Sequence, residues 1–335
     1  MNGQPSLARQ LESFFHHRLT RQRNATPATI KAYRDALRLL VLFAAERIGR
    51  KPCALSVEDL DREVILEYLD HLEGRRGNCI HTRNTRLTAV RSFFHHVAAS
   101  DPASIGVAQR VLAIPSKKAD IPATHYLSRC ELDALIDAPN QHSPRGRRDR
   151  VLLLFLARTG ARISEALNVD AADVSLDGAR SYVMLRGKGR KERMIPLARD
   201  AARAIEDLLR ERHVDRHDHL PLFVGARGER LTRFGAVHVL RRVITAASRQ
   251  MPELRRKHIS LHVFRHSLAM ILLQSGSDLL TIQAWLGHAQ VATTHRYAAA
   301  DVEMMRRGLV KAGIQDKAVH RFRPKDAVLS LLEDL

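Results

Sequence analysis

Apolar positions in the first hundred residues recur at helical spacing. Thr26 followed by proline is typical of a helix start, and apolar side chains then return every three or four residues up to Gly49. The sequence Ser-Val-Glu-Asp at 56–59 predicts the start of another helix, and residues 84–99 repeat the apolar pattern. Together with an amphipathic segment at 7–19, these patterns predict a bundle of about four helices without a strand.

The periodicity fails between residues 101 and 127, where prolines and polar residues predict a linker. A capping box at Ser128–Glu131 starts the next domain. An apolar helix is predicted at 148–158, and residues 181–197 predict two short strands around a Gly-Lys-Gly turn. Further helices are predicted at about 199–212, 233–250, 261–275, 278–286, 293–297 and 302–312, with a short amphipathic one in the final DAVLSLLEDL.

These elements predict a mainly α protein with a small β-hairpin in its second domain. The predicted boundaries are a helical domain at 1–100, a linker at 101–127, a second domain at 128–312 and a tail at 313–335. No apolar run approaches the roughly 18 residues that a membrane span needs, and the first residues lack a signal-peptide pattern. Three widely spaced cysteines argue against a disulfide framework, so we expect a cytoplasmic protein.

The net positive charge of the chain indicates a polyanionic partner, which the helical pattern alone does not. The 55 Lys and Arg residues exceed the 36 Asp and Glu residues by 19. The excess is +7 in residues 1–127 (19 basic, 12 acidic) and +12 in residues 128–312 (32 and 20), whereas the tail is balanced (4 and 4). Two folded basic domains are typical of nucleic-acid binding, although a merely soluble basic surface would give the same composition.

The second domain holds several polar residues at positions that their neighbours fix. Arg162 and Glu165 lie three residues apart on one helical face, as do His262 and Arg265. Lys188 lies between two glycines at the tip of the predicted hairpin, where the backbone can approach a ligand closely. Farther along the chain, two more candidates follow the helix at 278–286: His288 and Tyr297.

These residue types match the needs of phosphoryl transfer without a metal. Arginine forks bind two phosphate oxygens, and histidine can donate a hydrogen bond or move a proton near neutrality. A lysine can protonate a leaving alkoxide, and a tyrosine hydroxyl can attack phosphorus and store the bond covalently. Fixed cations stabilise the charge that develops on phosphate oxygens in the transition state.

Each residue also has a simpler interpretation. Arg162 with Glu165 is compatible with a structural ion pair, and Tyr297 with a core tyrosine. The basic run around Lys188 could bind phosphates without catalysis. His258, His262 and His266 recur every four residues, but no carboxylate and no HExxH pattern accompany them, so a zinc site is disfavoured.

Taken in order, four strings closely resemble the tyrosine recombinase (phage integrase) family. They are ARTGARISEALNV at 157–169, GKGRKERMIPL at 187–197, LHVFRHSLAM at 261–270 and WLGHAQVATTHRYAAAD at 285–301. The stretches at 26–44 and 84–98 resemble the family's helical core-binding domain less specifically. The resemblance implies a SAM-like helical core-binding bundle followed by an α+β catalytic domain.

The resemblance also implies roles for single residues. Tyr297 would be the nucleophile that forms a 3′-phosphotyrosyl link to DNA, and Lys188 the general acid toward the leaving 5′ oxygen. Glu165 would support the first arginine of the site, and no metal or ATP would be needed. The other implied catalytic residues are Arg162, His262, Arg265 and His288, and the expected DNA-binding residues are Arg83, Arg86, Arg186, Arg190, Lys191 and Arg193.

The expected partner is double-stranded DNA that carries a specific recombination site. In this family four protomers join in synapsis, so we expect a tetramer on DNA, with the C-terminal helix docked either on a neighbour or on its own domain. The 38 residues after Tyr297 favour an enzyme of a mobile element or plasmid. Two other functions stay open at this point: relaxation of DNA like that by type IB topoisomerases, and DNA binding without catalysis.

Overall fold

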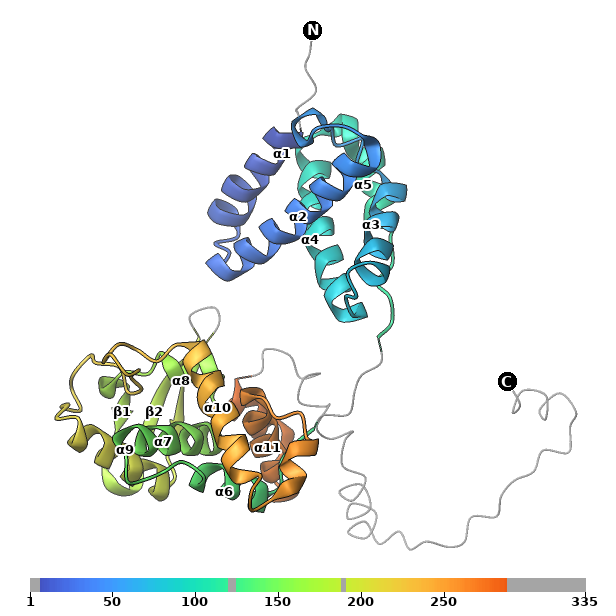
Figure 1. The fold of residues 1–335 in the computed structure, drawn as a ribbon. Coiled ribbons are helices and arrows are strands. Elements are labelled where there is room, and N and C mark those ends of the chain that lie inside the picture. The colour runs from blue at the N-terminus through green and yellow to red at the C-terminus, as the bar shows by residue number, and fades with distance from the viewer. Residues whose placement is uncertain (1–6, 120–124, 188–190, 288–335) are drawn as a thin grey trace, which may run out of the picture. The chain divides into compact units, whose positions relative to one another are not determined.

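The computed structural model describes residues 7–119, 125–187 and 191–287, and its chain divides into two compact units between Ile121 and Pro122 (Figure 1). Each unit has its own hydrophobic core. The first unit is helical throughout its described residues. Its elements are α1 (Leu7–Ser13), the π-helical η1 (Phe14–Gln22), α2 (Pro27–Ile48), η2 (Pro52–Ala54), α3 (Arg62–Gly74), α4 (Ile80–Ser100), η3 (Pro102–Ser104) and α5 (Ile105–Leu112).

Capping residues set the ends of α2 as the sequence predicts. The Thr26 hydroxyl accepts a hydrogen bond from the backbone N–H of Thr29 (3.3 Å), and Gly49 ends the helix in the left-handed conformation at φ +72°. The helix start predicted at 56–59 is wrong. There, the Asp59 carboxylate accepts hydrogen bonds from the backbone N–H and the hydroxyl of Ser56 (2.8 and 3.1 Å), which closes a local turn. Helix α3 begins only after Asp61, whose side chain caps the N–H of Val64 (2.9 Å).

The beginning of the predicted linker is also wrong, because residues 105–112 form α5. This helix packs against α4 and buries Ala108 and Val111 in the same core as Phe93. Its apolar spacing lies between prolines at 102 and 115, which made the whole stretch resemble a linker. The first unit therefore extends beyond the predicted boundary at residue 100.

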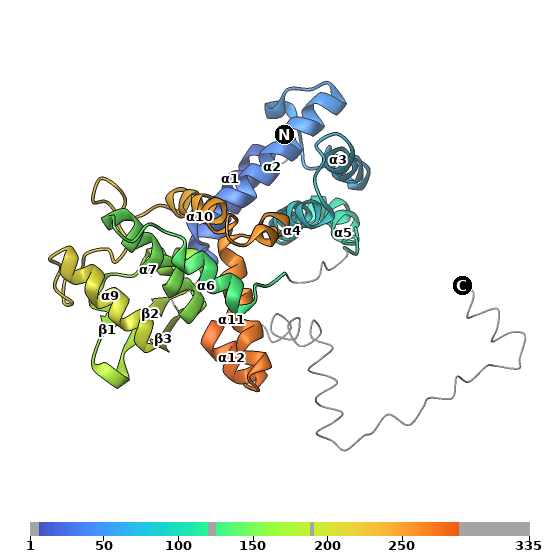
Figure 2. The ribbon, with the colours of Figure 1, turned by 60° about the horizontal axis from the view of Figure 1, so that its bottom comes forward.

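The second unit is built around the apolar helix α7. Helix α7 contacts α6, α8, α9 and α11 (Figure 2). Phe155 on α7 and Phe223 are completely buried. The helix begins at Pro144, earlier than predicted, with Ser143 as its N-cap, and it ends at Gly160 as predicted. The helical elements are α6 (Arg129–Asp137), α7 (Pro144–Thr159), α8 (Ile163–Leu167), η4 (Ala171–Asp173), η5 (Gly178–Arg180), α9 (Arg199–Glu211), α10 (Arg233–Ala247), η6 (Pro252–Arg256), α11 (Leu261–Gln274) and α12 (Leu279–Leu286).

A small antiparallel sheet in the order β1-β2-β3 completes the unit. Strands β2 (Tyr182–Arg186) and β3 (Glu192–Pro196) form the predicted hairpin, with Leu185 opposite Arg193. Strand β1 (Val174–Ser175) was not predicted, because a segment of two residues carries no detectable alternation. The fold class is confirmed: mainly α, with a small sheet in the second unit.

Several predicted features lie outside the described residues. These are residues 188–190 at the tip of the hairpin, the helices at 293–297 and 302–312, the tail at 313–335 and part of the linker. Within the described ranges, no helix is long and apolar enough to cross a membrane.

Candidate active site

Among the predicted catalytic residues that the structure describes, Arg265 is the most deeply buried. It lies on α11, only 1% of it is exposed, and its guanidinium reaches two helix ends. Nη1 donates a hydrogen bond to the carbonyl of Gly160 after α7 (2.8 Å), and Nη2 donates to the carbonyl of Leu286 at the end of α12 (2.5 Å). Helix C-termini expose unpaired carbonyls and the negative end of the helix dipole, so both acceptors favour a cation.

Arg162 directly precedes α8 and pairs with Glu165 on the first turn of that helix. Arg162 Nη1 donates to Glu165 Oε1 and the backbone N–H of Arg162 donates to Oε2, both at 2.8 Å. The expected pair of Arg162 and Glu165 is therefore present. Because Glu165 is buried at 3% exposure and Arg162 is 34% exposed, the carboxylate anchors the arginine from below and leaves part of the guanidinium accessible.

A second arginine, Arg193, also binds the carboxylate of Glu165. Arg193 on β3 donates from Nη2 to Glu165 Oε2 (2.7 Å) and from Nη1 to Oε1 (3.2 Å). Burial alone would raise the pKa of Glu165, but the hydrogen bonds and positive charge of Arg193, with those of Arg162, outweigh it. The pKa consequently lies below its ordinary value, and Glu165 is ionised near neutrality.

Arg162, Arg193 and Arg265 all donate hydrogen bonds to the end of α12, each to a different one of three successive backbone carbonyls. Trp285 O accepts from Arg193 Nε (3.0 Å), Leu286 O from Arg265, and Gly287 O from Arg162 Nη2 (3.2 Å). Three residues that are far apart in the sequence thus meet at one helix end, which directly precedes residue 288. Helices α11 and α12 lie side by side (Figure 2). The hydrogen bond from Arg265 on α11 to Leu286 joins the two helices at this end.

His262 lies one turn before Arg265 on α11. Its residue surface is solvent-exposed, and its ring packs edge-on against His266 with ring centroids 4.7 Å apart. Neighbouring protein atoms partly desolvate the ring and lower its pKa, and the positive charges of Arg265 and Arg162 lower it further, whereas Glu165 opposes them. The neutral imidazole is therefore favoured near pH 7 and can accept a proton.

No metal site emerges among the residues that the structure describes. No group of three or more His, Cys, Asp or Glu side chains there is arranged to hold an ion, the run of His258, His262 and His266 included.

Four predicted site residues lie outside the described ranges: Lys188, Arg190, His288 and Tyr297. The described residues on either side of the hairpin tip are joined, since the backbone N–H of Gly187 donates to the carbonyl of Lys191 (2.7 Å).

The expected DNA-binding residues fall into two groups. Lys191 and Arg186 are at the surface, with Arg186 also paired to Asp173 (2.7 Å) and Glu192 (3.2 Å). Arg83 is 3% exposed beside Glu73 (3.4 Å), and Arg193 is held by Glu165. Because Arg83 and Arg193 are held in buried ion pairs, a direct phosphate contact is not favoured for either of them. Arg86 is half-buried and belongs to neither group.

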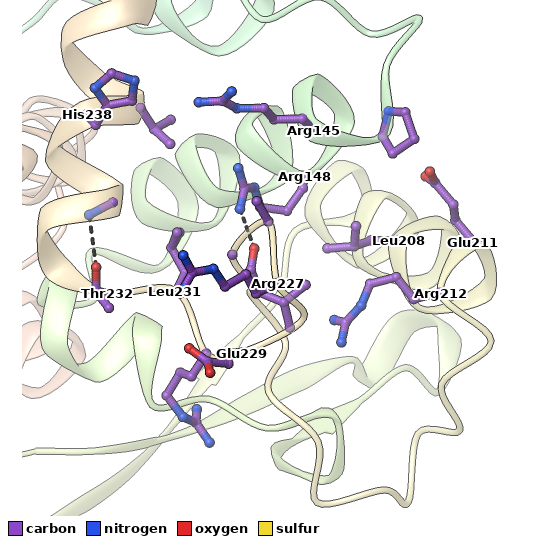
Figure 3. A pocket seen from close by; sticks show the side chains of 17 residues that line it. Arg145, Arg148, Leu208, Glu211, Arg212, Arg227, Glu229, Leu231, Thr232 and His238 are labelled. Carbon is purple, nitrogen blue, oxygen red and sulfur yellow. Dashed lines mark hydrogen bonds between the residues drawn. The ribbon is translucent and has the colours of Figure 1, made fainter.

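A separate cavity of about 570 Å³ lies between the start of α7, the end of α9 and the start of α10 (Figure 3). Two of the arginines that line it, Arg148 and Arg212, are engaged within the protein. Arg148 donates to the carbonyl of Val224 and pairs with Asp149, and Arg212 donates to the carbonyls of Pro221 and Leu222 (2.9 and 2.8 Å). These arginines hold the loop before α10 in place, and none of the residues that line the cavity belongs to the arginine cluster at α12.

Sequence reasoning missed the partners of the arginines rather than the arginines. Carbonyl acceptors leave no signature in a sequence, because every residue has one. The available signal was indirect: Gly160 and Gly287 both mark helix ends, and helix ends are where unpaired carbonyls gather.

Three arginines, a neutral histidine and a buried carboxylate gather at one helix end of an α+β domain, and this arrangement suits the binding of a phosphate. Residues 125–304 match the model of the phage integrase family, and residues 11–100 match that of the phage integrase N-terminal SAM-like domain. The chain belongs to the phage integrase family, whose tyrosine recombinases cleave and rejoin DNA strands in site-specific recombination.

Two relatives and one solved structure illustrate this membership. The integrase/recombinase-type protein y4rD of Sinorhizobium fredii is 60% identical over 262 residues, which cover 78% of this chain and 93% of that protein. Tyrosine recombinase XerC of Pelobacter propionicus is 33% identical over 89% of this chain and 93% of its own length. The crystal structure of the site-specific recombinase XerH bound to its palindromic difH substrate, after cleavage, matches with a TM-score of 0.67 at 25% identity, covering 87% of this chain and 81% of that one.

Proposed function

We propose that the protein is a site-specific recombinase of a mobile element or plasmid that works through a 3′-phosphotyrosyl intermediate on Tyr297. The observation that carries the proposal is the meeting of Arg162 and Arg265 at the end of α12, beside His262. Two guanidinia and an imidazole at one place fit a scissile phosphate, whose oxygens gain charge in the transition state. The chain continues from that helix end to His288 and Tyr297.

In the proposed reaction the Tyr297 hydroxyl attacks the scissile phosphorus, and the bond to the 5′ oxygen breaks. His262, which is neutral near pH 7, takes part in the proton transfer, while Arg162, Arg265 and His288 bind the phosphate oxygens. Lys188 protonates the leaving 5′ oxygen. The freed 5′ hydroxyl then attacks the phosphotyrosine of a partner duplex, which rejoins the strands and restores Tyr297 without a metal or ATP.

The division of labour follows the two units. The first unit acts as a core-binding DNA domain and the second as the catalytic domain, and both bind the duplex through their positive charge. Four protomers assemble at synapsis on a specific recombination site in the cytoplasm. The tail at 313–335 docks on a protomer, its own or a neighbouring one. The 38 residues that follow Tyr297 support a mobile-element enzyme.

The test uses a supercoiled plasmid that carries the DNA flanking this gene. We expect incubation with the protein in EDTA, followed by quenching with detergent, to leave protein covalently attached to DNA. The Tyr297→Phe variant, which lacks only the hydroxyl, should leave none. Recombinant products in the same reaction would distinguish a recombinase from a type IB topoisomerase, which would give relaxed plasmid alone.

Two outcomes would contradict the proposal. An adduct that persists in Tyr297→Phe would assign the nucleophile to another residue. Salt-sensitive DNA binding without any adduct, on plasmids that carry either flank of the gene, would favour a DNA-binding protein without catalysis.

A further inference from the structure

Arg193 was expected to contact DNA, yet its side chain faces into the protein. It is 14% exposed, and three hydrogen bonds engage its guanidinium: Nη2 and Nη1 donate to Glu165 (2.7 and 3.2 Å), and Nε donates to the carbonyl of Trp285 (3.0 Å). All three nitrogens therefore have partners within the protein. A phosphate contact would require this side chain to leave a carboxylate and a helix end.

The partners of Arg193 lie on three different elements. Arg193 itself belongs to β3, Glu165 to α8, and Trp285 to the last turn of α12. A planar guanidinium has its donors fixed in a fork, so it can hold a carboxylate on one edge and a carbonyl on the other at the same time. A lysine at this position would supply the charge but could not hold both groups in this geometry.

Gly287 lets Arg193 approach the backbone after α12. A Cβ atom on residue 287 would lie 3.1–3.2 Å from Nη1, Cδ and Cζ of Arg193, and the φ of Gly287 is +63°. The guanidinium therefore packs directly on the main chain that leads to residue 288. In the sequence, Lys188 comes shortly before β3, which carries Arg193.

We propose that Arg193 is a positioning residue that joins the hairpin, the carboxylate beneath Arg162 and the end of α12 into one unit. It acts through Glu165 and the α12 backbone and does not contact DNA. This inference rests on the proposed function, because its expected effect is on catalysis. By holding β3, α8 and the end of α12 together, Arg193 keeps the catalytic side chains near these elements in their relative positions. Misplacement of a catalytic group by about 1 Å can cost on the order of 100-fold in rate.

The experiment compares Arg193→Lys and Arg193→Ala in the full chain with Arg148→Lys as a matched control. Arg148 is similarly buried in an ion pair of the same unit (11% exposed) but lies at the separate cavity, away from the arginine cluster. The probe is a flanking-DNA duplex that forms an adduct with the unaltered chain. We measure the dissociation constant for this duplex and its salt dependence, the adduct rate at saturating protein, and thermal stability.

We expect both Arg193 variants to lower the saturated adduct rate by roughly 10–100-fold while the dissociation constant stays within about 3-fold. Lysine should not restore the rate, because it keeps the charge but lacks the fork. Combining Arg193→Lys with Glu165→Gln should add little to either single effect, because the two residues act as one unit. Arg148→Lys should lower stability and leave the rate unchanged below its unfolding temperature.

A second readout does not depend on activity. Trp285 is the only tryptophan of the chain, and its indole N–H donates to the carbonyl of Thr159 (3.2 Å). Its fluorescence therefore reports on the end of α12. Arg193→Ala should shift the emission to longer wavelength and increase quenching by acrylamide about 2-fold or more over the unaltered chain, and Arg148→Lys should not.

The proposal is overturned if Arg193→Ala weakens DNA binding and lowers the salt slope by about 1 while the saturated rate and Trp285 fluorescence are unchanged, as a phosphate contact requires. It is also overturned if the Arg193 variants lose only stability, as the control does. If the unaltered chain forms no adduct, the proposed function fails, and the fluorescence of Trp285 still decides whether Arg193 positions α12.

Discussion

At the scale of single residues, the candidate site depends on arginines held by main-chain carbonyls. A buried guanidinium is costly unless its donors are satisfied, and Arg265 meets this condition at the ends of two helices. The sequence motifs point to Arg162, Glu165, His262 and Arg265, and the structure brings these residues close to one another. The sequence does not predict the burial of Arg193, because a surface arginine and a buried one look alike in a basic run.

Replacing Arg265 with lysine should destabilise the second unit. One ammonium group cannot reach both the Gly160 and the Leu286 carbonyls, so one buried acceptor loses its partner at a cost of roughly 1–3 kcal/mol. Urea unfolding followed by the fluorescence of Trp285 measures this loss. The exposed Arg145 on α7 provides the control, because Arg145→Lys should leave stability within about 0.5 kcal/mol. Equal effects of the two substitutions would contradict the anchoring role of the carbonyls.

The pKa of His262 should be lowered by its partial burial and by its cationic neighbours. In the DNA-free protein we expect its pKa to lie below about 6.5, the ordinary value, so that the ring is neutral at pH 7 and gains a proton only as the pH falls further. Because a lowered pKa in the folded state favours the neutral form, this histidine lowers stability as the medium becomes acidic. Histidine NMR signals measure the midpoint.

Arg162→Ala should raise the midpoint of His262, since the substitution removes a positive charge and leaves Glu165 with one less partner. An unchanged midpoint would mean that Arg162 does not act on the ring electrostatically. Lys31 on α2, in the other unit, provides the control, because Lys31→Ala should leave the midpoint in place.

At the scale of elements, helix ends were predicted correctly where a capping residue satisfies the end of a helix directly. Thr26 with Gly49, and Ser128 with Glu131, mark the ends that the structure has, because their side chains or backbones satisfy helix ends directly. Ser56 and Asp59 carry the same signature but satisfy each other in a turn. A capping motif identifies a local hydrogen-bond pattern, and the residues that follow determine whether a helix continues from it.

Gly160→Ala should cost more than the same change at another left-handed glycine of the second unit. At Gly160 (φ +63°) a Cβ would lie 2.7 Å from Leu286 Cδ2 and 3.0 Å from Leu268 Cδ2, whereas Gly276 (φ +87°) has nothing within 4 Å. Gly276→Ala should therefore lose about 1 kcal/mol from backbone conformation alone. Gly160→Ala should lose that and a further 1–3 kcal/mol, roughly, from overpacking against α12.

Urea unfolding of both glycine variants checks the difference. The Gly160 variant should also lower the adduct rate, because it displaces Leu286, whose carbonyl holds Arg265. If both alanines cost the same, the contact between Gly160 and α12 is not tight, and the helix end is positioned by other means.

At the scale of the whole molecule, the described apolar residues form a separate core in each unit, and α11 and α12 add a smaller cluster to the second unit. Phe93 and Phe94 belong to a cluster drawn from residues 7–114, and Phe155 and Phe223 to one drawn from residues 127–264. Composition predicts two domains, and the structure has two compact units. The sequence pattern places the end of the first domain before α5, because α5 has few residues and is flanked by prolines.

A fragment of residues 1–119 should fold by itself. Its cluster includes side chains of α5, so a fragment that ends at residue 100 should be less stable by several kcal/mol, since it leaves apolar side chains of α4 exposed. Circular dichroism during thermal unfolding should show a cooperative helical transition for 1–119 and a lower or absent one for 1–100. Equal transitions would mean that α5 contributes nothing to the first unit.

The three successive carbonyls at the end of α12 have a consequence for how such a site can diverge. A substitution at position 285 or 286 changes a side chain but leaves the acceptor oxygen, so these arginine anchors cannot be removed by changing the residue that supplies them. Selection then acts on the backbone conformation at the end of α12, because the identity of the residue that supplies each carbonyl does not matter. Two homologues can differ at every acceptor position and still hold their arginines alike, which lets the surrounding surface change its DNA target while the chemistry stays fixed.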